Sequence, residues 1–233
     1  MAKRNKKKSD ETLVDLAEKS EQAKDFYGKN QNMILGVLFG LVVLVGGWYA
    51  YTNLYKKPLQ MEAIKEMAQA ERMFERDSFA LALGNPGGGA LGFEQIANKY
   101  SGTAAGNLAN YYAGVSWMQL GEPKAALTYL NNYSPDGTVL PITYYGVLGD
   151  VYSEIAYADK TGMDDAISNY KKAIAQGTNE FLQAYYMKKL GLLYEYEGKM
   201  AEAKTMFEDL KDKYPNTPEG RDIDKYIGRV SVN

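Results

Sequence analysis

Few side chains in this sequence are of the types that carry out chemistry at protein sites. The chain of 233 residues contains no cysteine and no histidine. This excludes thiolate nucleophiles, disulfide bonds and cysteine-linked lipid, and it removes the most common general base and transition-metal ligand. The 29 Asp and Glu residues are dispersed over helical patterns, as is typical of solvated helix faces. We therefore expect a non-enzyme without metal or cofactor, although an enzyme that uses Asp, Glu, Lys, Ser or Tyr stays an open alternative.

A glycine-rich stretch, GNPGGGALG at residues 84–92, invites comparison with a phosphate-binding loop. Such a loop needs a preceding strand and a following Gly-Lys-Ser/Thr, and neither is present. Five glycines and one proline in nine residues cannot continue a helix. We interpret the stretch as a loop between two helices, the first over residues 59–83 and the second over 93–100.

Charge is distributed unevenly along the chain. Residues 1–8 contain five of the 27 Lys and Arg residues and no acid, whereas residues 56–233 contain 19 basic and 23 acidic residues. A mildly acidic main region lacks the basic face that phosphate contacts require. We expect neither a nucleic acid partner nor a small-molecule substrate, and we assign the basic tail to the neighbourhood of a membrane.

The membrane assignment depends on residues 30–55, which contain no Asp, Glu, Lys or Arg. Twenty helical residues cover the ~30 Å hydrocarbon layer of a bilayer, and the stretch shows no polar stripe of the kind that a buried core helix has. Aromatic residues stand at both ends, as at a membrane interface: Phe26, Tyr27, Trp48, Tyr49, Tyr51 and Tyr55. No signal-peptidase pattern follows. We predict one uncleaved transmembrane helix over residues 31–55.

The orientation of this helix follows from the basic residues on its two sides. Eight Lys and Arg residues precede it and five lie in the 21 residues after it, which predicts a cytoplasmic N-terminus and a translocated C-terminal part. Residues 1–30 form the tail, in which 12–27 have the pattern of a short amphipathic helix. That helix either lies on the membrane surface or is solvated.

Small residues recur on one side of the predicted span. Gly36, Gly40, Val43 and Gly47 project in similar directions at 100° per residue, so that another helix could pack closely against them. We take Gly36, Gly40 and Gly47 as a candidate helix contact, with the general frequency of glycine in membrane helices as the alternative.

Residues after the span repeat a helix–turn–helix pattern. The clearest copy places Leu190, Gly191, Tyr194, Gly198, Ala203, Phe207 and Pro215 at regular positions. The copy before it has Tyr145, Leu148, Gly149, Tyr152, Ala166, Tyr170 and Ala173, with five extra residues at 158–162. A third has Gly114, Trp117, Gly121, Ala126 and Leu130, and departs from the pattern at Asn110 and Tyr133. These copies resemble the tetratricopeptide repeat (TPR) family.

Together with the predicted membrane span, the resemblance predicts an all-α protein: a single N-terminal transmembrane helix is followed by a TPR-type helical solenoid over residues 56–233. One repeat cannot bury its apolar face alone, so that neighbours stack and share a core. We place units at about 59–103, 104–141, 142–183 and 184–218. A polar capping helix is expected at 218–230.

In the TPR family the first helices of the repeats line a groove. The corresponding positions give these candidate contacts for a partner: Tyr111, Val115, Met118, Asp150, Tyr185, Lys188, Leu192 and Glu195. Tyrosines, aliphatic residues and few charges suit an apolar or extended polypeptide more than a ligand carboxylate. Packing of these residues against the opposite wall is the alternative.

The order of basic tail, membrane span, linking helix and repeats is similar to that of single-span TPR proteins of the bacterial inner membrane, which are ancillary subunits of the SecYEG translocon. This resemblance covers about residues 26–220. It implies a periplasmic solenoid that works beside the translocon with a membrane-anchored chaperone of the prolyl-isomerase type. A scaffold for another envelope secretion or assembly machine remains an alternative.

Overall fold

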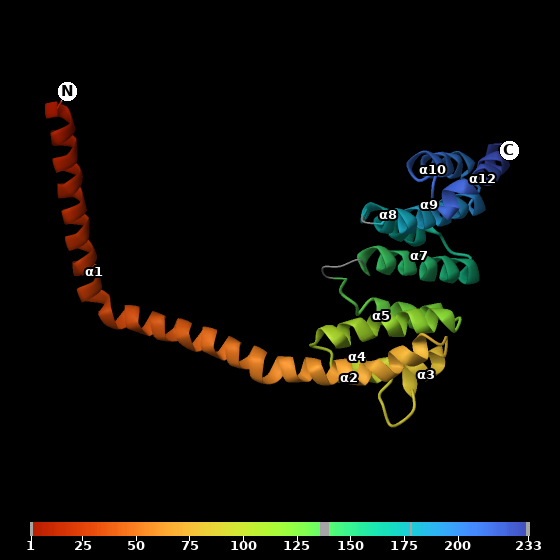
Figure 1. Ribbon diagram of the computed structural model, residues 1–233, viewed down its shortest axis with the longest axis horizontal. Coiled ribbons are helices and arrows are strands. Elements are labelled where there is room, and N and C mark those ends of the chain that lie inside the picture. Colours follow the sequence, from red (N-terminus) through yellow and green to blue (C-terminus); the bar gives the residue numbers. More distant parts are fainter. Residues whose placement is uncertain (1, 136–139, 178, 232–233) are drawn as a thin grey trace. The chain divides into compact units, whose positions relative to one another are not determined.

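The computed structural model describes the backbone of residues 2–135, 140–177 and 179–231, and within these ranges the side chains of residue 24 and of residues from 26 onward (Figure 1). All regular secondary structure in the described residues is helical. The chain divides into two compact units, Met1–Pro58 and Leu59–Asn233. The all-α prediction is confirmed.

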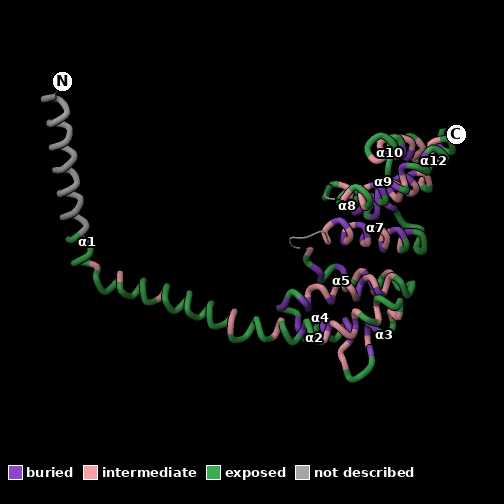
Figure 2. The backbone as a smooth tube through the Cα atoms, in the orientation of Figure 1, coloured by how far each residue is buried: buried purple, intermediate pink, exposed green. Residues whose placement is uncertain are grey.

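The first unit contains α1 (Ala2–Ala50) and a π-helical segment, η1 (Tyr51–Lys56). Among the described residues, one helix is long and apolar enough to cross a membrane, judged by length and composition; it begins at Phe26. The residues of its apolar part are almost all exposed in the chain alone (Figure 2). The apolar members of the predicted amphipathic segment at residues 13–23 lie outside the described side chains.

The second unit is a succession of helices that pack on their sequence neighbours (Figure 1). These are α2 (Lys57–Phe74), α3 (Phe79–Gly84), α4 (Phe93–Lys99), α5 (Ala104–Gln119), α6 (Pro123–Leu130), α7 (Leu140–Asp159), α8 (Asp164–Ala175), α9 (Glu180–Tyr196), α10 (Met200–Lys213), α11 (Pro218–Arg221) and α12 (Asp224–Ser231). The pairs α5–α6, α7–α8 and α9–α10 pack as helical hairpins, and α8 then contacts α9 while α6 contacts α7. The TPR-like solenoid is thus present.

Close approach of the two helices in a hairpin depends on a glycine opposite a ring. A Cβ added at Gly149 of α7 would overlap the ring of Tyr170 on α8, and one added at Gly191 of α9 would overlap the ring of Phe207 on α10. Phe207 is fully buried. The glycine on one helix and the aromatic ring on the other therefore determine how closely the two helices of a hairpin approach.

The prediction of one helix over residues 59–83 is wrong. Helix α2 ends at Phe74 and α3 begins at Phe79, because Asp77 adopts a left-handed backbone conformation with φ of 55°. The amide of Asp77 donates to Phe74 O and the amide of Ser78 donates to Met73 O, which is the hydrogen-bond pattern of a Schellman C-cap. The rings of Phe74 and Phe79 then pack edge to face across the break, 5.4 Å apart.

Two further differences concern helix lengths. The extra residues of the second repeat lengthen α7, which continues seven residues past Tyr152, whereas α5 and α9 each end two residues past the matching aromatic residue. In place of a single capping helix over 218–230, the structure has α11 and α12. The break between them places Ile223 in the core, where it is fully buried.

Candidate functional site

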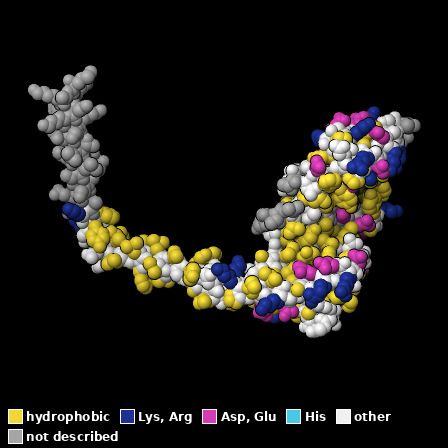
Figure 3. Space-filling view, viewed as in Figure 1, with side chains coloured by type: hydrophobic (Ala, Val, Ile, Leu, Met, Phe, Trp, Pro, Cys, Tyr) yellow, Lys and Arg dark blue, Asp and Glu magenta, His cyan; other side chains and the backbone are white. Residues whose placement is uncertain are grey.

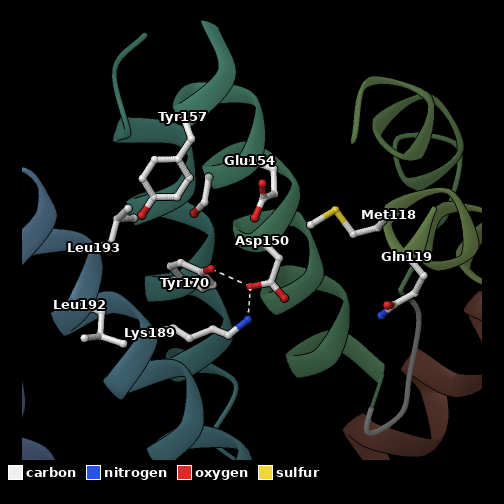
Figure 4. A pocket seen from close by; sticks show the side chains of 10 residues that line it. Met118, Gln119, Asp150, Glu154, Tyr157, Tyr170, Lys189, Leu192 and Leu193 are labelled. Atoms are coloured by element: carbon white, nitrogen blue, oxygen red, sulfur yellow. Dashed lines mark hydrogen bonds and ion pairs between the residues drawn. The ribbon is translucent and has the colours of Figure 1, made fainter. Parts of the chain in front are cut away.

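A cavity of about 310 Å³ lies where α5, α7 and α9 meet. Figure 3 shows that hydrophobic side chains gather over this part of the second unit, between charged side chains toward its two ends. The residues that line the cavity come from α5, α7, α8 and α9 (Figure 4): Met118, Gln119, Asp150, Ser153, Glu154, Tyr157, Tyr170, Lys189, Leu192 and Leu193. Three of the groove residues predicted from the sequence are among them, namely Met118, Asp150 and Leu192.

Asp150 is the polar centre of the cavity (Figure 4). Its Oδ1 accepts a hydrogen bond of 2.6 Å from the Tyr170 hydroxyl and lies 2.6 Å from Lys189 Nζ. The carboxylate and the ammonium are both largely buried, with side-chain exposures of 23% and 29%. Ion pairs at this depth restrict the geometry of the residues that carry them, so that Asp150 links α7 to both α8 and α9.

Glu154 lies one turn after Asp150 on the same helix and is exposed. Among the described residues, its carboxylate makes no hydrogen bond and no ion pair. Ser153, between them, donates its hydroxyl to Gly149 O at 2.8 Å. The cavity therefore contains one carboxylate already bound and one that is free to bind a ligand.

Burial and the charge of Asp150 shift the pKa values of neighbouring groups. The pKa of Tyr170 is raised strongly, first by burial and then by the adjacent carboxylate. Burial acts to lower the pKa of Lys189, but the charge and hydrogen bond of Asp150 raise it above the usual value. At neutral pH Lys189 is thus charged, and its ammonium pairs with the carboxylate of Asp150 inside the cavity.

Tyr111, Val115 and Tyr185 extend this face on both sides of the cavity without lining it. The ring of Tyr111 packs on Tyr133 with centroids 5.3 Å apart, and Val115 is half-buried on the same helix. Tyr185 is 40% exposed, and Lys189 Nζ lies 4.9 Å from the centroid of its ring. These residues are accessible to a ligand that extends beyond the cavity.

Lys188 and Glu195 lie elsewhere, at the contact between α9 and α12. Arg229 Nε lies 2.5 Å from Glu195 Oε1, and Lys188 Nζ lies 5.1 Å from the ring centroid of Tyr226. Both side chains therefore contact the C-terminal helix α12 of the same chain. Their repeat positions gave no sign of this contact, because the partner residues follow an irregular break.

Sequence reasoning did not select Lys189, Tyr170 or Tyr157 for the site. Lys189 is one position away from the expected groove series, and Tyr170 was assigned to the core by its repeat position. Tyr157 lies in the extra turns of α7, where its ring packs edge to face on Tyr196 with centroids 4.5 Å apart. The insertion in the second repeat was the available signal, because it lengthens α7 and so places Tyr157 at the cavity.

A second hollow of about 730 Å³ lies between α4, α5 and α6. It is lined mostly by amides and hydroxyls, among them Gln95, Asn98 and Thr128. At its edge Glu94 Oε1 accepts hydrogen bonds from Trp117 Nε1 at 2.9 Å and from the Tyr129 hydroxyl at 2.7 Å. The carboxylate is thereby satisfied within the chain.

The glycines of the apolar helix have open space around them. No atom lies within 4 Å of a Cβ placed at Gly36, Gly40 or Gly47. Nothing in the described residues packs on this stripe, so that the structure leaves the predicted helix contact untested. Across the described residues, no group of three or more Asp and Glu side chains is placed to hold a metal ion.

Comparison with known families supports the repeat assignment. A family model described as tetratricopeptide repeat matches residues 187–217, which cover most of α9 and all of α10 and continue to the start of α11. Searches among curated proteins and among solved structures found no match. Solenoids of such repeats bind partners on extended concave surfaces. The repeat at residues 187–217 therefore indicates a protein–protein interaction module.

Proposed function

We propose that this protein is an ancillary subunit of the SecYEG translocon in the bacterial inner membrane. The N-terminus lies in the cytoplasm, the apolar helix crosses the bilayer once, and the solenoid lies in the periplasm. There the α5–α7–α9 face binds a membrane-anchored chaperone of the prolyl-isomerase type or the emerging polypeptide itself. We assign no catalytic activity to the chain.

The observation that supports this proposal most directly is the accessible face of tyrosines and aliphatic residues around the cavity. Met118, Leu192 and Tyr185 stay partly or largely exposed there, although their solenoid has a well-filled core. Methionine and tyrosine adapt to varied apolar partners at small entropic cost. Such a face fits extended polypeptide of varied sequence.

The anchor gives the solenoid its location. A tether to the membrane converts binding at the translocon exit into an effectively intramolecular event, with local concentrations that can reach the millimolar range. The stripe at Gly36, Gly40 and Gly47 would pack on a transmembrane helix of the partner, since glycine lets two helix backbones approach closely. Orientation follows from the excess of basic residues before the span.

Site-specific photo-crosslinking in intact membranes tests this proposal. A photoreactive phenylalanine derivative replaces Leu192 in the cavity or, as the control, Thr205, which is exposed on α10 outside it. Products are identified by mass spectrometry. We expect SecY or a membrane-anchored prolyl isomerase to crosslink from position 192 and not from position 205.

Crosslinks from position 192 to the components of another envelope machine would instead support the scaffold alternative. Equal products from the two positions would contradict binding by this face. Neither residue is fully buried: Thr205 is exposed, and Leu192 is half-buried at the edge of the core, so that circular dichroism of both variants checks that the fold is retained.

A further inference from the structure

The cavity between α5, α7 and α9 combines apolar walls with a carboxylate, that of Glu154, for which the described part of the chain provides no partner. Met118 approaches from α5, while Leu192 and Leu193 belong to α9 and Tyr157 to the extended end of α7 (Figure 4). An aliphatic chain of several carbons could lie between these side chains. Its polar end would then meet the acidic turn of α7.

The two carboxylates on that turn, those of Asp150 and Glu154, differ in whether they already have a partner. Asp150 Oδ1 already accepts from Tyr170 and Lys189, whereas Glu154 has no partner among the described residues. The Tyr157 phenol lies near this carboxylate: its pKa is raised first by burial, then by Tyr196, and then by Glu154 and Glu197. A cation entering the cavity therefore meets a free carboxylate beside an aromatic ring.

A ligand carboxylate fits less well. The cation of the cavity, Lys189, is held by Asp150 at 2.6 Å and lies against the ring of Tyr185. An incoming anion would have to displace Asp150 and approach Glu154 at the same time. Like charges at close range are destabilising in a binding site, which leaves a basic side chain as the complementary group.

We propose that the cavity binds an arginine or lysine side chain of the partner polypeptide, with the aliphatic stem against Met118 and Leu192 and the cation at Glu154. Arginine is preferred, because its planar guanidinium both pairs with a carboxylate and stacks on an aromatic ring such as that of Tyr157. This inference rests on the proposed role of the face in binding polypeptides. It specifies which segments are bound, namely apolar segments that carry a single basic residue.

Binding of three labelled peptides to the full-length protein in detergent tests the inference. The peptides share one uncharged, leucine-containing sequence and differ only at a central residue, which is arginine, norleucine or glutamate. Fluorescence anisotropy gives the dissociation constants. We expect the arginine peptide to bind about fivefold more tightly than the norleucine peptide, as for one partly exposed ion pair, and the glutamate peptide to bind most weakly.

Three variants test which residues cause the tighter binding of the arginine peptide relative to the norleucine peptide, called here the arginine advantage. We expect Glu154→Gln to remove this advantage. Lys189→Met enlarges it, because the cation that competes with the arginine peptide is gone. Asn98→Ala, in the separate hollow between α4, α5 and α6, leaves it unchanged. Circular dichroism of each variant checks that the helices are retained, and Glu154 is exposed, so that its substitution leaves the core intact.

The inference is overturned if arginine and norleucine peptides bind equally, if the glutamate peptide binds most tightly, or if Glu154→Gln keeps the arginine advantage. Absence of binding by all three peptides overturns it as well. In each of these cases the crosslinks from position 192 still decide separately whether the face meets SecY or a chaperone in the membrane.

Discussion

Glycine and large apolar side chains occur in both units, but their surroundings are opposite. A Cβ at Gly149 or Gly191 in the second unit would overlap a ring, whereas one at Gly36 or Gly40 in the first unit would meet nothing within 4 Å. Phenylalanine differs in the same way, since Phe207 is fully buried and Phe39 is 71% exposed. Packing within the chain therefore explains the choice of glycine and phenylalanine in the second unit. It does not explain that choice in the described residues of the first unit.

Small and apolar residues in the first unit therefore match an environment outside the chain. In the second unit the same residue types mark how closely two helices approach. This contrast gives matched pairs of substitutions, one in each unit, whose effects should differ.

Removal of residues 1–55 should produce the largest effect. Every buried hydrophobic residue of the described chain lies at Ala63 or beyond, so that the truncated protein should keep its helical fold and its melting midpoint. It should lose its association with the membrane completely. Sedimentation of lysed cells and thermal melting measure the two outcomes, and a truncated chain that fails to fold would contradict the independence of the second unit.

Phe207→Ala and Phe39→Ala compare the two units at the same residue type. Loss of the fully buried ring should lower the free energy of unfolding of the second unit by about 3–5 kcal/mol. The substitution at position 39 should leave it unchanged. Urea denaturation in mild detergent, followed by circular dichroism, measures both, and equal effects would show that the burial contrast has no energetic meaning.

Gly149→Ala and Gly40→Ala test the space around glycine. The added methyl group at position 149 meets the ring of Tyr170, whose hydroxyl is fixed on Asp150. Overpacking of this kind should cost about 1–3 kcal/mol. No loss of stability is expected at position 40, and a stability of Gly149→Ala equal to that of the unaltered protein would mean that the hairpin can widen freely.

Alkaline pH should affect the second unit through its buried phenols. The pKa of Tyr129 is raised to about 12, first by burial and then by its hydrogen bond to Glu94. As pH rises from about 10 towards 12, the unfolded chain releases this proton while the folded chain keeps it, so that stability is present below pH 10 and falls in this window. Tyr129→Phe should make the fall less steep in urea denaturation series at pH 9 to 12. A slope equal to that of the unaltered protein would contradict the assigned environment.

The sequence was informative where repeat position determines packing. Gly149 and Gly191 were assigned to the repeats by their regular positions, and in the structure each lies opposite an aromatic residue of the same repeat, Tyr170 and Phe207. The helical fold and the apolar N-terminal helix could be predicted because both depend on patterns that extend over many residues. Met118, Asp150 and Leu192 were assigned to the groove on the same basis, and the structure brings them to one cavity.

Local breaks were not predictable in the same way. Asp77 ends α2 with a left-handed conformation, yet the apolar periodicity of residues 59–83 continues through it. Lys188 and Glu195 lie at repeat positions of the groove, but they contact Tyr226 and Arg229 of α12. Such contacts depend on how the last helices fold back, which a repeat pattern does not contain.

The most direct test of the account is protease treatment of intact spheroplasts that contain the full-length protein. We predict that protease added outside digests the solenoid and leaves a protected N-terminal fragment of about the size of residues 1–55. A solenoid that stays intact until the membrane is permeabilised would contradict the proposed anchoring and location.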